Sequence, residues 1–179
     1  MSLLHCMSVD PVRFIKPAPD IFLPASTVHV WKIPVSGMES GLLSEAEMAY
    51  AERFRSAADK NRFTTGRQML KLLSSKYLFI PPEEVVVAGE RHHKPIIANR
   101  TKKSFHFNLS HSGQWILIAF SESELGVDLE EIDTGFSFCN IVQDQFDVSE
   151  RDFVFKAPDP TRAFYLLWTR KEALLKAWR

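Results

Sequence analysis

The sequence is poor in cysteine, and its two cysteines, Cys6 and Cys139, lie far apart. Two cysteines are too few for a disulfide framework, and their separation does not match the spacing of metal-binding pairs. The chain also lacks an apolar run long enough to span a membrane, and its N-terminus lacks the basic region and apolar core of a signal peptide. We therefore expect a protein of a reducing, cytoplasmic setting.

An excess of charge of either sign is also missing. Lys+Arg and Asp+Glu each number 22, so no overall charge attracts nucleic acid or an anionic membrane. We expect neither as a partner. What the chain does have is 179 residues with 45% hydrophobic content, which is enough to bury a core in one domain or two small subdomains.

The strand patterns lie mainly in the middle of the chain. Prolines make residues 1–26 an irregular lead-in. The runs that favour strands are residues 27–35, 84–88, 96–98, 104–109 and 114–120. Gly113 suits a tight turn between the last two strands, which makes Ser110 and His111 part of a Ser-His-Ser-Gly turn. Strands in the middle with helices on either side are typical of an α+β fold.

Helix signals flank these strands. Ser44 and Glu47 form a capping box that begins a helix reaching residue 54. Apolar residues three or four apart predict an amphipathic helix over residues 59–79. Its basic residues are expected to be ordinary solvated charges: Arg62, Arg67 and Lys71.

Two more helices are expected near the end of the chain. Ser149 caps a short helix through residue 155, whereas residues 136–146 give an ambiguous pattern. Asp159 followed by Pro160 begins a last helix that runs to the end of the sequence. Three of its apolar residues are expected in the core: Trp168, Leu175 and Trp178.

The strongest chemical signal is a pair of carboxylates, Asp128 and Glu130. In an extended strand both point to the same side, with Cα atoms about 6.6 Å apart. They repel each other unless a proton or a cation neutralises them, and Mg²⁺ often binds through one or two carboxylates with phosphate oxygens. The alternative is a solvated strand face. Glu172 and Lys176, four residues apart, could equally be a simple helix pair.

Four motifs in series resemble a known family. They are Lys94-Pro95, FNLSHS at residues 107–112, GVDLE at residues 126–130, and WTRKEA at residues 168–173 with Lys176. Over residues 43–178 the chain resembles 4′-phosphopantetheinyl transferases of the surfactin-synthetase-activating type. The resemblance implies an α+β fold of two pseudo-symmetric subdomains. It also implies Mg²⁺-dependent transfer of 4′-phosphopantetheine from coenzyme A to a serine of an acyl or peptidyl carrier protein, with release of 3′,5′-ADP.

The resemblance gives roles to residues on the metal side of the site. Asp128, Glu130 and Glu172 match the metal-binding carboxylates. Glu172 also matches the base that takes the proton of the carrier serine. Lys176 would stabilise the leaving pyrophosphate oxygen.

Other residues match the coenzyme A side. Ser110 and His111 match a motif that contacts the 3′-phosphate of coenzyme A. Arg62 matches an arginine at the start of the second helix that binds the same phosphate. Lys94 matches a Lys-Pro loop that lies along the nucleotide.

Two departures from the family leave alternatives open. The family continues past the lysine matching Lys176 with a Gly-rich turn and further strands. We therefore expect residues 1–122 to form an N-terminal subdomain and residues 123–179 to begin a C-terminal one that is truncated. The first helix is acidic where the family often has phosphate-binding lysines. The alternative is thus a catalytically incompetent homologue or a non-enzymatic carrier-protein binder.

Two other hypotheses use the same residue types. A metal-dependent phosphodiesterase would use the same carboxylates. A zinc site would need histidines, but no Cys/His pair has the usual zinc-site spacing, and adjacent His92 and His93 point apart.

Overall fold

A computed structural model describes most of the chain. It describes residues 3–8 by their backbone, and residues 21, 23–37, 41–89, 94–99 and 105–178 in full. The predictions for His92 and His93, for residue 104 and for much of the lead-in lie outside these ranges. Within them, no helix is both long enough and apolar enough to cross a membrane.

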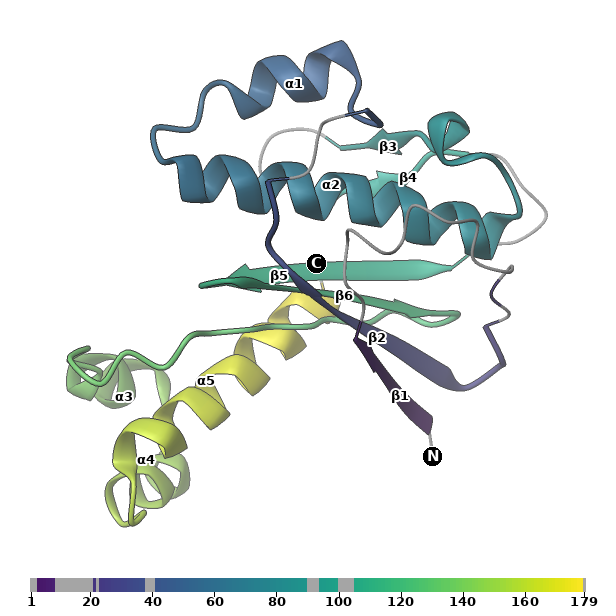
Figure 1. Ribbon diagram of the computed structural model, residues 1–179. Helices are drawn as coiled ribbons and strands as arrows, with labels where there is room; N and C mark the ends of the chain where they lie inside the picture. The colour runs from purple at the N-terminus through teal and green to yellow at the C-terminus, as the bar shows by residue number, and fades with distance from the viewer. Residues whose placement is uncertain are drawn as a thin grey trace.

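The centre of the fold is a four-stranded sheet (Figure 1). In spatial order its strands are β1 (Leu3–Ser8), β2 (Thr27–Pro34), β6 (Trp115–Ser121) and β5 (His106–Ser112). β1 runs parallel to β2, and the other neighbours are antiparallel. A separate small sheet pairs β3 (Val87–Ala88) with β4 (Ile96–Ile97). The five strands predicted between residues 27 and 120 are therefore present, with shifted ends.

The irregular lead-in predicted for residues 1–26 is wrong where β1 forms. β1 pairs with β2 in register from Leu3 opposite Thr27 to Ser8 opposite Lys32. The backbone groups of β1 bond to a strand some 24 residues away in the chain. The composition of the N-terminal residues alone gives no indication of this partner, so it does not predict the strand.

Helices flank the sheet on both sides. They are α1 (Glu45–Ala51), α2 (Ala57–Leu78), α3 (Cys139–Gln145), α4 (Val148–Phe155) and α5 (Pro160–Ala177), with a short 3₁₀ turn, η2 (Pro82–Glu84). The capping box of α1 is confirmed, because Ser44 Oγ accepts from the Glu47 amide and the Ser44 amide donates to Glu47. Asp159 caps α5 as predicted, whereas Asp147 rather than Ser149 caps α4.

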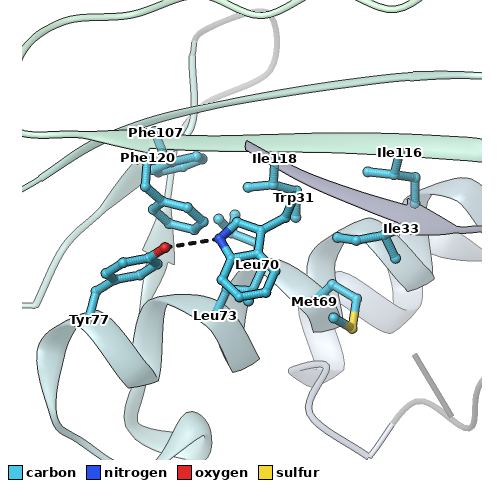
Figure 2. Close-up of a cluster of buried hydrophobic side chains, with 10 residues drawn as sticks. All are labelled: Trp31, Ile33, Met69, Leu70, Leu73, Tyr77, Phe107, Ile116, Ile118 and Phe120. Carbon is cyan, nitrogen blue, oxygen red and sulfur yellow. Dashed lines mark hydrogen bonds between the residues drawn. The ribbon is translucent and has the colours of Figure 1, made fainter. Parts of the chain in front are cut away.

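The main core lies between α2 and the sheet. Figure 2 shows Leu70, Leu73 and Tyr77 of α2 facing Trp31, Ile118 and other apolar side chains of the strands. The Trp31 indole N–H donates to the Tyr77 hydroxyl at 2.9 Å, so the polar ends of these two rings are satisfied within the core. This core holds α2 firmly over one face of the sheet.

A second, smaller core joins the C-terminal helices. It contains Val142, Phe146, Val154 and Phe164, and it explains why the ambiguous residues 136–146 include a helix. Only the N-terminal half of α5 contributes buried residues to it.

The expected core positions on the last helix are wrong for two of three residues. Trp168 packs against the second core, but Leu175 is 45% exposed and Trp178 is 77% exposed. The C-terminal half of α5 contacts the rest of the protein through its backbone and Lys176 instead. Its apolar side chains Leu175 and Trp178 are therefore left exposed.

The helices define two sides of the sheet. In Figure 1, α2 covers one face with α1 lying beyond it, while α5 approaches from the other side, with α3 and α4 standing away from the sheet. Strand β5 therefore presents one row of side chains to α2 and the opposite row to the side from which α5 approaches.

Candidate functional site

The predicted acidic strand is instead an irregular segment that comes after β6 in the chain and runs alongside β5. We call residues 124–133 the acidic segment; none of them forms regular secondary structure. The amides of Val127 and Leu129 donate to the side chains of Asn108 (2.9 Å) and Ser110 (3.3 Å) on β5. Because side chains rather than backbone carbonyls accept these bonds, the segment runs in step with β5 without joining the sheet.

Both carboxylates of the segment contact the same row of hydroxyls. Ser110 Oγ donates to Asp128 Oδ1 at 3.0 Å, and Ser112 Oγ donates to Glu130 Oε2 at 3.2 Å. These serines are two residues apart on β5 and share one face. Asp128 and Glu130 therefore lie on the same side of the acidic segment, which agrees with the expectation from their spacing.

Asp128 is the buried centre of the site. Its side chain is 4% exposed, and Lys176 Nζ of α5 donates to its Oδ1 at 2.6 Å. Its other oxygen, Oδ2, is buried and has no hydrogen-bond partner within the described residues. Such an atom is costly in a protein interior unless a cation or a donor meets it.

Negative charges of the site act on Glu130. Burial raises its pKa most, the charge of Asp128 raises it next, and Glu172 adds a smaller effect, against opposing effects of the Ser112 hydrogen bond and Lys176. Glu172, on α5, therefore adds to the negative charge that acts on Glu130. Lys176 pairs with Asp128 instead of forming the simple helix pair with Glu172.

The predicted metal site is only partly assembled. In the ranges that the structure covers, no three His, Cys, Asp or Glu side chains come close enough together to hold a metal ion. The assignment of Asp128, Glu130 and Glu172 as ligands therefore stays a prediction, and the zinc hypothesis gains no support from the described histidines.

Gly126 sets the distance between the acidic segment and α5. A Cβ atom at this position would overlap the Ala173 carbonyl oxygen and would lie 2.6 Å from the Ala177 amide nitrogen. Both atoms belong to the helix backbone, which cannot turn aside as a side chain can. Only glycine allows this approach, which brings Lys176 within reach of Asp128.

The coenzyme A residues divide between the two faces of β5. His111, Arg62 and Lys94 line a cavity of about 180 Å³ on the α2 side. Ser110 faces the opposite side, toward Asp128. The predicted Ser-His turn is wrong, because β5 continues through Ser112 and turns at Gly113; neighbouring residues of a strand then point to opposite faces.

The three cavity residues have further interactions. Arg62 donates to the Gly113 carbonyl at 3.1 Å and pairs with Asp59. Although His111 is an exposed residue, desolvation of its ring and the nearby Arg62 guanidinium lower its pKa. A cationic guanidinium beside a neutral imidazole is a suitable environment for an anion.

Lys94 connects the cavity to α5. Its Nζ donates to the carbonyl oxygens of Leu125 (3.1 Å) and Lys176 (3.0 Å). A cation at the C-terminal carbonyls of a helix is favourable because these carbonyls carry partial negative charge. Lys94 therefore joins the acidic segment, α5 and the cavity.

The expectation of solvated charges on α2 is wrong for Arg67 and Lys71. Glu47 of α1 lies 2.7 Å from Lys71 and 3.4 Å from Arg67, and the Lys71 side chain is 8% exposed. Burial raises the pKa of Glu47, but the bonds from Lys71 and the Ser44 amide, with the charge of Arg67, outweigh it, so the pKa lies below its usual value. Sequence reasoning missed Glu47 as their partner, because 24 residues separate it from Lys71.

Glu47, Arg67 and Lys71 also line the wall of a larger cavity. It has a volume of about 1130 Å³, and it shares His111 and Pro95 with the smaller cavity. Continuous space of this size beside cationic groups can accept an extended anionic molecule.

Comparison with known proteins agrees with the arrangement. The family described as 4′-phosphopantetheinyl transferase, N-terminal, matches residues 36–123, and the 4′-phosphopantetheinyl transferase superfamily matches residues 124–179. The chain is 34% identical over 169 residues to the 4′-phosphopantetheinyl transferase HetI of Nostoc sp., covering 89% of this chain and 71% of the relative. It is 32% identical over 136 residues to the 4′-phosphopantetheinyl transferase psf-1 of Bacillus pumilus, covering 75% of this chain and 57% of the relative.

Proposed function

This chain belongs to the 4′-phosphopantetheinyl transferase superfamily, and we propose that it transfers 4′-phosphopantetheine from coenzyme A to a serine of an acyl or peptidyl carrier protein, releasing 3′,5′-ADP. The two family matches cover residues 36–179 without a gap. Their junction supports the division into subdomains at residues 1–122 and 123–179. Cys139 is an exposed free thiol, which suits a reducing cytoplasm as the place of action.

The observation that carries this proposal is Oδ2 of Asp128, which has no hydrogen-bond partner in the part of the chain that the structure describes. This oxygen is buried, and the charges of Asp128 and Glu172 both raise the pKa of the neighbouring ligand candidate Glu130. Three carboxylates against the one ammonium of Lys176 leave an excess of negative charge, which a divalent cation would neutralise. The donor set fits Mg²⁺, with Asp128, Glu130 and Glu172 as the residues that would hold it.

When bound there, Mg²⁺ supplies a positive charge for pyrophosphate oxygens. The chain's own residues do the rest. Glu172 accepts the proton of the carrier serine, so that the hydroxyl oxygen attacks the β-phosphorus of coenzyme A. The bond from that phosphorus to the bridging oxygen breaks, and Lys176 donates to the leaving oxygen.

The cavity residues bind the other end of coenzyme A. Arg62 and His111 are the donors for the 3′-phosphate, and Lys94 lies along the nucleotide. Ser110 is better placed to hold Asp128 than to reach this phosphate, because it lies on the other face of β5.

The direct test is modification of an apo carrier protein. We expect the full chain, with coenzyme A and Mg²⁺, to add one phosphopantetheine group, seen as a mass increase of the carrier. The Asp128→Asn variant should lose this activity, and Asp144→Asn, at an exposed position on α3, should keep it. No mass increase with the unaltered chain, or equal activity of the two variants, contradicts the proposal.

Carrier binding without transfer is the second candidate. It is favoured by the Lys176 bond to Asp128, because this ammonium already neutralises part of the charge that would attract a metal ion. The same assay separates the two candidates. A carrier that binds the chain with unchanged mass supports the second one.

A further inference from the structure

Strand β5 supports the acidic segment through a regular row of polar side chains. Asn108, Ser110 and Ser112 each accept one backbone amide, from Val127, Leu129 and Glu131 respectively. Donor and acceptor are 19 residues apart in every pair. This constant separation fixes the register of the segment against β5, as backbone carbonyls would in a parallel sheet.

Two members of the row also hold the carboxylates themselves. The Ser110 and Ser112 hydroxyls accept the amides of Leu129 and Glu131 and donate their own protons to Asp128 and Glu130. Each serine therefore fixes a carboxylate and the following peptide group together. This double use consumes the single proton of each hydroxyl, and it leaves little freedom in the orientation of the carboxylate.

The need for such support follows from the charges. Ser110 and Ser112 lie two residues apart on one face of β5, so the carboxylates of Asp128 and Glu130 that they bind are held on the same side of the acidic segment. Without a backbone ladder, nothing regular in the acidic segment itself resists their separation. The hydrogen bonds to β5 oppose this separation, together with the Lys176 ammonium that pairs with Asp128.

We infer that Asn108 and Ser112 are positioning residues for the cation site: they hold Glu130 and the backbone of the acidic segment in the geometry that a divalent cation requires. The inference rests on the proposed function, because it concerns the same carboxylates. Neither residue needs to touch the cation. Partners that orient metal ligands typically affect metal affinity by about 10–100-fold.

The test uses the full chain and two substitutions at Ser112. Ser112→Ala removes the acceptor and the donor, whereas Ser112→Thr keeps both. We expect Ser112→Ala to weaken Mg²⁺ binding, measured by calorimetry, by about 10-fold, and to speed hydrogen exchange of the Glu131 amide. Ser112→Thr should restore both properties. Ser121→Ala is a matched control. It removes a β6 serine whose hydroxyl accepts the Ser123 amide, away from the carboxylates.

Asn108 gives an independent variant. Asn108→Ala should speed exchange of the Val127 amide, and Asn108→Asp should keep that amide protected, because the Oδ1 acceptor remains. The expected effect on Mg²⁺ binding is smaller than at Ser112, since Asn108 holds the backbone but neither carboxylate.

The possible failures can be told apart. If the unaltered chain binds no Mg²⁺, the cation in the proposed function is wrong, while amide exchange still tests the support by β5. If Ser112→Ala leaves both Mg²⁺ binding and Glu131 exchange equal to those of the Ser121→Ala control, the positioning role is overturned. Faster exchange with unchanged Mg²⁺ binding overturns the link to the cation site.

Discussion

Replacing Gly126 by alanine should move α5 away from the acidic segment while the central sheet stays folded. The added Cβ would overlap the Ala173 carbonyl oxygen and would lie 2.6 Å from the Ala177 nitrogen. Ordinary contact at such a position begins near 3.4 Å. The helix must therefore retreat by about 1 Å to clear the Ala177 nitrogen and by more to clear the Ala173 oxygen, because packed backbone cannot absorb the overlap locally.

The expected cost follows from what that shift disturbs. Overpacking of this kind costs about 1–3 kcal/mol. The shift also lengthens the contacts of Lys176 with Asp128 and with Lys94, which are 2.6 Å and 3.0 Å. We expect a loss near the upper end, about 3 kcal/mol, which lowers the melting temperature of a chain of this size by about 6–12 °C.

Thermal unfolding of the two glycine variants Gly126→Ala and Gly41→Ala measures this cost. Gly41 is the matched control, because a Cβ there meets nothing within 4 Å. Hydrogen exchange should rise in the last turns of α5 in the first variant and stay unchanged in the second. Equal melting temperatures for the two variants would refute the close approach of α5 to Gly126.

Two further predictions concern charged groups. Glu47→Gln should lower the free energy of unfolding by about 3 kcal/mol, because it leaves the Lys71 ammonium buried without its carboxylate partner. Chemical denaturation measures this loss. Glu45→Gln, at an exposed position, is the control and should be as stable as the unaltered chain. The pKa of His111 is lowered in the folded protein. As the pH falls, the His111 imidazole is therefore protonated more readily in the unfolded chain than in the folded one. The free energy of unfolding should then decrease as the pH drops below about 6.5. His111→Asn should reduce that fall, by less than about 1 kcal/mol because the residue is exposed. An unchanged denaturation midpoint of Glu47→Gln would contradict the role of Glu47 as the partner of Lys71. If the stability of His111→Asn varies between pH 7 and pH 5 as that of the unaltered chain does, His111 is not the cause of the pH dependence.

Features that depend on near neighbours in the chain could be predicted from the sequence. The Ser44 and Glu47 capping box, the Asp159 cap of α5 and the turn at Gly113 each involve residues at most three positions apart. Their chemistry is complete within a few residues, so tertiary contacts need not be known. The family resemblance is confirmed by the family matches to residues 36–123 and 124–179.

The support of the site could not be predicted in this way. Asn108 and Ser112 look like ordinary polar residues of an edge strand, and nothing local says that they accept amides 19 residues further on. The pairing of Lys176 with Asp128 likewise spans 48 residues. Such contacts follow from how α5 approaches the sheet, which is a property of the whole fold.

The long separation of Asp128 from its ammonium partner has a consequence for biosynthesis. The β5–β6 hairpin leaves the ribosome before the acidic segment, so its row of hydroxyls is ready when Asp128 emerges. Lys176 follows only 48 residues later, and until then burial of that carboxylate is unfavourable. The nascent protein therefore completes its sheet before it closes the anionic pocket, which must wait for the C-terminal turns of α5.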